Sequence, residues 1–186
     1  VKLVDKHGIA VTVPLYPLAP EAGVLDTTGF ALDFYRHYCD QVPGPFVMGG
    51  DSAGGGLTAA TVMAAREAGL RLPSGLMLIC PWLNAEGNDP SQIAIEKRDC
   101  ILRLSGIRDA GKLYARDLPV TDPKVSPIHG DWQGLPPMQM FGGIRENISP
   151  TITIPSEAPT PARIELAAAN LLTSKKFGPG LITARM

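Results

Sequence analysis

The feature that most constrains this chain is a turn of small residues, Gly50-Asp51-Ser52-Ala53-Gly54, between an apolar run and a helical pattern. The apolar run at residues 45–48 predicts a buried strand, and apolar residues at spacings of three and four over residues 52–68 predict a helix. A small residue at each end of such a turn lets the strand and the helix approach closely. We therefore expect a sharp, strained turn that holds the Ser52 hydroxyl at the carboxyl edge of a sheet.

Strand and helix patterns alternate along most of the sequence. Short apolar runs predict strands at residues 8–15, 45–48, 75–80 and 137–141. Helical spacing or cap-type residues predict helices at residues 26–39, 52–68 and 101–116. This alternation predicts an α/β fold, with a mostly parallel sheet flanked by helices.

Composition and charge indicate one soluble globular domain. The chain has 186 residues, 45% of them hydrophobic, and 17 Lys and Arg nearly balance 18 Asp and Glu. Neither nucleic acid nor an acidic membrane surface is an expected partner, because no basic stripe is present, and no apolar stretch is long enough to span a membrane. Three widely spaced cysteines predict reduced thiols and a cytoplasmic location rather than disulfides or a zinc site. The oligomeric state stays open.

The residue types around Ser52 favour nucleophilic chemistry. A serine raised on a strand-to-helix turn can attack a carbonyl carbon, and the helix N-terminus directs N–H groups toward the anion that forms. The Ala53 N–H is the first candidate for such an oxyanion donor. A glycine-rich turn can instead only pack tightly or hold phosphate, but a phosphate loop needs a lysine after its last glycine. The sequence has Gly56-Leu57 there, without lysine.

Further segments occur in an order typical of one protein group. They are Tyr16-Pro-Leu-Ala-Pro-Glu21, Cys80-Pro-Trp82, Asp122-Pro-Lys-Val-Ser-Pro127 and Leu135-Pro-Pro137. Together with the turn at Ser52, they resemble motifs of the hormone-sensitive-lipase-like esterases, the fold-3 group of the α/β hydrolases, with Pro17 in place of an arginine. The resemblance covers residues 1–147. It implies hydrolysis of small-molecule carboxylic esters through an acyl-enzyme on Ser52, with no metal and no organic cofactor.

Acyl transfer by serine also needs an acid and a base. Glu146 follows Gly142-Gly143, where the group places its carboxylate, so the resemblance implies Glu146 as the acid; a solvated surface glutamate is the alternative. In this fold the base is a histidine that follows the acid. His7, His37 and His129 all precede Glu146, and His129 is the candidate for a spatial substitute. The group's His-Gly-Gly-Gly loop, a source of oxyanion donors, does not occur.

The resemblance ends near Asn147, and the rest of the chain is rich in Ser, Thr and Pro. We therefore expect a partial α/β-hydrolase domain at residues 1–147, truncated at its N-terminus, and a divergent, irregular tail at residues 148–186 that a frameshift would explain. Within the tail, residues 162–176 have an amphipathic helical pattern, and residues 177–186 look frayed. Two functions follow as alternatives: a carboxylic ester hydrolase, or an inactive remnant or ligand-binding protein that keeps the fold without the chemistry.

Overall fold

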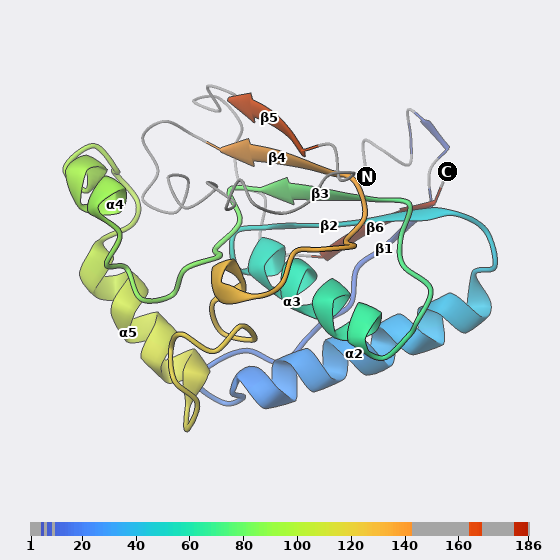
Figure 1. Cartoon of the computed structure of the whole chain (residues 1–186), viewed down its shortest axis with the longest axis horizontal. Helices are drawn as coiled ribbons and strands as arrows, with labels where there is room; N and C mark the ends of the chain where they lie inside the picture. The colour runs from blue at the N-terminus through green and yellow to red at the C-terminus, as the bar shows by residue number, and fades with distance from the viewer. Residues whose placement is uncertain (1–4, 6, 9, 143–163, 169–180, 186) are drawn as a thin grey trace.

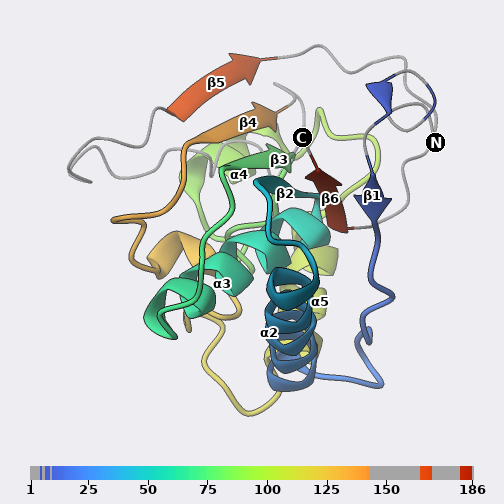
Figure 2. The same cartoon turned by 90° about the vertical axis from the view of Figure 1, so that its right-hand side faces the viewer.

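The computed structural model describes residues 5, 7, 8, 10–142, 164–168 and 181–185. In this part of the chain, six strands form one sheet in the order β1-β6-β2-β3-β4-β5. Helices α2, α3 and α5 lie on the same side of the sheet in both views (Figures 1 and 2). The elements are β1 (Val11–Thr12), α2 (Val24–Gln41), β2 (Phe46–Asp51), α3 (Ala53–Glu67), β3 (Gly75–Ile79), α4 (Pro90–Ile95), α5 (Leu104–Ala115), the 3-10 helix η1 (Pro127–His129), β4 (Met138–Gly142), β5 (Ile164–Ala168) and β6 (Leu181–Arg185).

The centre of the sheet is parallel. β2 pairs with β3, β3 with β4, and β4 with β5 in parallel, whereas β6 is antiparallel to both β1 and β2. Within the ladder of β2 and β3, Gly50 is opposite Leu78 and Asp51 is opposite Ile79. The carboxyl ends of these two strands therefore meet beside Ser52. The predicted α/β class, with a mostly parallel sheet flanked by helices, is confirmed.

Apolar side chains fill the space between the helices and the sheet. Phe46, Leu78 and Met140 come from β2, β3 and β4, and their exposed fractions are 1%, 0% and 0%. The Phe46 ring contacts Tyr35 and Tyr38 of α2, with ring centroids 5.9 and 5.3 Å apart. Burial of each such side chain stabilises the fold by about 1.5–3 kcal/mol. This core fixes α2 and α3 against β2, and so fixes the turn between β2 and α3.

Three expectations about local structure were wrong. The strand expected at residues 8–15 is only Val11–Thr12 in the structure, and Pro14, which has no N–H for a ladder, follows shortly after it. The helix expected at residues 162–176 is contradicted at residues 164–168, which form strand β5 beside β4. Residues 181–185, expected to be frayed, form strand β6. In both tail segments, pairing with a neighbouring strand decides the local structure rather than helical spacing.

Candidate active site

Ser52 is the single residue between β2 and α3, and its backbone is strained. Its φ is 53° and its ψ is −118°, a conformation that costs a residue with a side chain on the order of 1–3 kcal/mol. Main-chain hydrogen bonds hold it there. Ser52 N donates to Ile79 O at 2.9 Å, and Ser52 O accepts from the N–H groups of Gly55, Gly56 and Trp82 at 3.0, 3.2 and 2.9 Å. The sharp turn expected from the sequence is therefore present and fixed by its own backbone.

The glycines of this turn are required by close contacts. A Cβ at Gly50 would lie 2.2 Å from Gly54 O, and a Cβ at Gly56 would lie 2.3 Å from Trp82 O. Both contacts are with main-chain atoms, which cannot rotate away. The close approach expected at Gly50 and Gly54 is confirmed, and the contact of Gly56 with the segment that leaves β3 adds a second one. We call residues 50–56 the Ser52 turn.

Ser52 is half-buried and Ala53 is exposed. Because Ala53 is the first residue of α3, its N–H has no acceptor within the helix and is free to face a ligand there. The positive end of the helix dipole adds a favourable potential for an anion. This geometry suits a developing oxyanion next to the Ser52 hydroxyl. The Ala53 N–H remains the candidate oxyanion donor that the sequence suggested.

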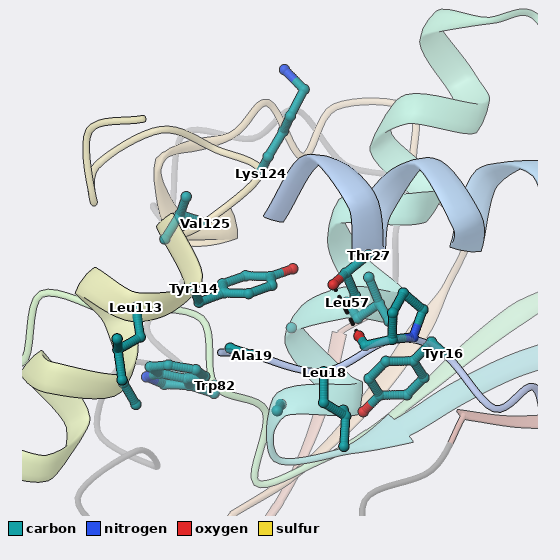
Figure 3. A pocket seen from close by; sticks show the side chains of 14 residues that line it. Tyr16, Leu18, Ala19, Thr27, Leu57, Trp82, Leu113, Tyr114, Lys124 and Val125 are labelled. Carbon is teal, nitrogen blue, oxygen red and sulfur yellow. Dashed lines mark hydrogen bonds between the residues drawn. The ribbon is translucent and has the colours of Figure 1, made fainter. Parts of the chain in front are cut away.

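A cavity of about 280 Å³ opens beside the Ser52 turn (Figure 3). We call it the Tyr114 cavity, after the α5 tyrosine whose ring lies across it. Ala53 belongs to both the cavity and the Ser52 turn. Trp82, another residue of the cavity wall, donates its main-chain N–H to Ser52 O. The lining residues are Tyr16, Pro17, Leu18, Ala19, Thr27, Ala53, Gly56, Leu57, Trp82, Ala110, Leu113, Tyr114, Lys124 and Val125.

The walls are mostly apolar, with a few polar atoms. Thr27 Oγ1 donates to Pro17 O at 3.1 Å or Gly23 O at 3.0 Å, which ties the loop before α2 to that helix. The Tyr16 hydroxyl and Trp82 Nε1 are buried without a hydrogen-bond partner among the described residues. Burial raises the pKa of Tyr16 and of Tyr114, and the nearby Tyr16 raises that of Tyr114 further. Both phenols are therefore neutral at ordinary pH and able to donate a hydrogen bond.

The three histidines do not gather at Ser52. His7 and His37 are exposed, and His37 lies on α2. His129, the candidate for a spatial substitute base, is paired with Glu86, with Nε2 and Oε2 2.8 Å apart. The neighbouring Gly130 packs against Met63, so closely that a Cβ there would lie 2.6 Å from the sulfur.

Met63 is about three helical turns beyond Ser52, or about 16 Å along the axis of α3. The loop that carries His129 is therefore anchored toward the far end of α3. Glu146, the expected acid, lies outside the described residues. Of the three expected site residues, the structure thus describes Ser52 and Ala53, which are adjacent.

Sequence reasoning missed the Tyr114 cavity. Eight of its fourteen residues, among them Tyr16, Trp82 and Lys124, fall within the segments that carry the family resemblance, but no signal in the sequence indicated that they line one cavity. Tyr114 follows Leu113 in an ordinary amphipathic helix. The place of Tyr114 in the cavity could not be predicted from the sequence, because it depends on the packing of α5 beside Trp82.

A mostly parallel sheet packed with helices and a strained serine between a strand and a helix are typical of the α/β hydrolases. The chain belongs to the α/β-hydrolase fold family, whose model matches residues 1–150. Within that family it is hormone-sensitive-lipase-like, as the sequence motifs predicted.

Individual relatives agree with this assignment. The chain is 33% identical over 144 residues to an acetyl-hydrolase of Streptomyces hygroscopicus, covering 76% of this chain and 48% of the relative. It is 31% identical over 134 residues to an esterase of Acinetobacter venetianus, covering 70% and 44%. Among solved structures, a mutant of the esterase E40 matches with a TM-score of 0.77 at 28% identity, over 83% of this chain and 53% of that one. A hormone-sensitive lipase from a metagenome library matches with a TM-score of 0.73 at 28% identity, over 81% and 53%.

The chain spans about half the length of the relatives it matches. Within the residues that the structure describes, every helix is too short or too polar to cross a membrane. The same residues contain no group of three or more His, Cys, Asp or Glu side chains that could hold a metal ion.

Proposed function

We propose that the chain carries the nucleophile of a carboxylic ester hydrolase, with Ser52 as the attacking residue. The observation that supports this most is the strained Ser52 backbone, held by four hydrogen bonds directly beside a cavity. A strained backbone conformation persists only where surrounding contacts compensate for its cost. Residues with strained backbones are frequently found in active sites. The names of the relatives, acetyl-hydrolase and esterase, give the proposal its reaction and favour a short acyl group.

In the proposed reaction, Ser52 Oγ attacks the ester carbonyl carbon and the alcohol leaves. Water then releases the acid from the acyl-enzyme. The Ala53 N–H donates to the oxyanion of each tetrahedral intermediate, and Glu146 is the proposed acid that would orient a base. The base is the remaining requirement, since the loop that carries His129 is anchored toward the far end of α3. If no group performs that role, the chain binds esters without turning them over, which is the alternative function.

Three further features belong to the proposal rather than to the observed site. The substrate is a small-molecule ester, without nucleic acid as a partner. The location is cytoplasmic. The hydrolase domain comprises residues 1–147, and residues 148–186 are a separate tail, although β5 and β6 from that tail pair with strands of the sheet.

The test compares the purified chain with Ser52→Ala on a chromogenic acetate ester and a butyrate ester. We expect the substitution to reduce hydrolysis to the rate of the ester in buffer. Ser105→Ala, an exposed serine on α5, is the matched control and should leave the rate unchanged. Equal rates for the chain and Ser52→Ala would overturn the proposal. Mass spectrometry after treatment with a phosphonate ester gives a second readout, because a nucleophilic Ser52 becomes labelled and Ser105 does not.

A further inference from the structure

The Tyr114 cavity is an extension of the proposed catalytic site. It begins at Ala53, one residue from Ser52, and its Trp82 wall is joined to Ser52 O by a main-chain hydrogen bond of 2.9 Å. A group bound there could therefore belong to the same ester molecule whose carbonyl carbon lies at Ser52. A role for this cavity in binding part of the ester rests on the proposed ester hydrolysis.

The size of the cavity exceeds what a short acyl group needs. A cavity of about 150 Å³ is enough to hold a benzene ring. At about 280 Å³, the Tyr114 cavity has room for a ring with a short substituent, about ten non-hydrogen atoms by that comparison. An acetyl group would leave most of this space empty, so the volume fits the alcohol side of a short-acyl ester better.

Of the three α5 residues that line the cavity, Ala110, Leu113 and Tyr114, only Tyr114 has a polar side-chain atom. Leu57, Leu113 and Val125 supply apolar wall, and Leu113 is 54% exposed near the surface. Figure 3 shows the Tyr114 ring across the cavity with its hydroxyl on the side of Thr27, and no cavity residue drawn there shares a hydrogen bond with that hydroxyl. Tyr114 is half-buried, so its hydroxyl can reach water while the cavity is empty. A ligand that fills the cavity displaces this water and must offer the phenol an acceptor, because a donor that is buried without a partner costs free energy.

We propose that the Tyr114 cavity binds the alcohol moiety of the ester, a compact ring that carries a hydrogen-bond acceptor, and that Tyr114 is the residue that selects for this acceptor. The ring lies between Trp82, Leu57 and Leu113, and its acceptor oxygen receives the Tyr114 O–H. Alcohols of the same shape without the oxygen bind less tightly, because they leave the phenol without a partner.

The test measures binding of alcohols, so that it does not depend on turnover. The two probes are trans-4-methoxycyclohexanol and trans-4-ethylcyclohexanol, which have the same shape and differ by an ether oxygen in place of a methylene. Calorimetry on the unmodified chain gives both Kd values. Fluorescence of Trp82 gives them again in Trp132→Phe, since the sequence has only two tryptophans and Trp132 lies in the core. Loss of folding in Trp132→Phe would leave the calorimetric test intact.

We expect the methoxy alcohol to bind about fivefold more tightly than the ethyl alcohol, the effect of one net hydrogen bond. In Tyr114→Phe this preference should disappear, whereas Tyr38→Phe, a core tyrosine of α2, should keep it. Ala110→Phe, which places a ring into the cavity from the exposed face of α5, should weaken both alcohols.

Three results would overturn the inference: equal Kd values in the unmodified chain, a preference that survives Tyr114→Phe, or displacement of the alcohols by hexanoate at lower concentration, which would assign the cavity to the acyl group. A chain that binds the alcohols as expected but hydrolyses no ester would instead contradict only the proposed function.

Discussion

The Ser52 turn and the α5 wall of the Tyr114 cavity belong to one candidate site, but different atoms hold them in place. The turn is fixed by main-chain contacts, with Gly50 against Gly54 and Gly56 against Trp82 O. The α5 wall is formed by side chains, of which Leu113 is 54% exposed and Tyr114 is half-buried. The two glycines of α5 differ in the same way. A Cβ at Gly106 would meet nothing within 4 Å, whereas a Cβ at Gly111, which lies outside the cavity wall, would lie 2.5 Å from Ala85 O.

This difference separates two requirements on an enzyme of this class. Main-chain contacts specify one geometry and tolerate almost no substitution, which suits the position of a nucleophile. Side-chain walls can change while the fold is kept, which suits a pocket whose ligand differs between relatives. We therefore expect substitutions in the turn to act mainly on stability and those in the α5 wall to act mainly on ligand choice.

The largest expected effect comes from Gly50→Ala. The new methyl group would lie 2.2 Å from Gly54 O, so β2 and α3 must move apart. We expect a loss of about 3 kcal/mol or more in the free energy of unfolding, measured by urea denaturation. Gly106→Ala on α5 is the matched control and should stabilise the chain by about 0.5–1 kcal/mol, because alanine is the better helix former. Similar losses at both positions would remove the contrast between the two regions.

The sequence was sufficient for the Ser52 turn because local geometry dictates its residues. A strand that reverses sharply into a helix needs small residues at Gly50 and Gly54, and these are visible without any tertiary information. The central strands β2, β3 and β4 were predictable for a similar reason, since each is a short run of mostly apolar residues whose pattern is visible in the local sequence.

The Tyr114 cavity and the strands of the tail were not predictable in this way. The cavity joins the loop before α2 to α3, Trp82 and α5, so its shape exists only after these segments pack. Residues 164–168 have helical spacing in the sequence, yet they pair with β4 as a strand. Strand formation there depends on a partner far along the chain, and a local pattern carries no information about that partner.

The second effect concerns pH and tests whether Tyr114 is held in an apolar wall. Burial raises the pKa of Tyr114 above its ordinary value of 10.0. The protonated phenol is thus favoured in the folded chain, so its contribution to stability is complete below pH 10 and is lost as the pH rises above 10. Between pH 9 and pH 11, we expect the unmodified chain to lose up to about 1.4 kcal/mol more than Tyr114→Phe, measured by urea denaturation.

Tyr35→Phe provides the comparison in the core. Burial also raises the pKa of Tyr35, but the Tyr35 hydroxyl donates to Arg71 O at 2.6 Å. This variant should therefore be less stable at every pH and should also have a flatter pH dependence. If Tyr114→Phe has the same pH dependence as the unmodified chain, the phenol is solvated and the α5 wall is open to water.

A third, smaller effect isolates the strain at Ser52. Ser52→Gly and Ser52→Ala both remove the hydroxyl, but only glycine adopts φ 53° and ψ −118° without steric cost. Relief of strain favours the glycine variant, and its more flexible unfolded state offsets part of that gain. We expect Ser52→Gly to be more stable than Ser52→Ala by about 1 kcal/mol in thermal and urea unfolding. A more stable alanine variant would mean that the backbone at Ser52 is relaxed.

The smallest expected effect is that of His129→Gln, which tests whether the site is confined to the Ser52 turn and the Tyr114 cavity. His129 and Glu86 have side-chain exposures of 41% and 21%, and a pair of such partly exposed polar side chains contributes about 0–1 kcal/mol even when both are charged. Gly130, the residue after His129, packs against Met63, about three helical turns beyond Ser52 on α3. The free energy of unfolding should therefore change by less than about 1 kcal/mol, with Glu86→Gln giving a similar value, and the rate of ester hydrolysis should stay the same. A loss of hydrolysis in His129→Gln but not in Glu86→Gln would make His129 the missing base, and the catalytic group would then extend beyond the two regions compared above.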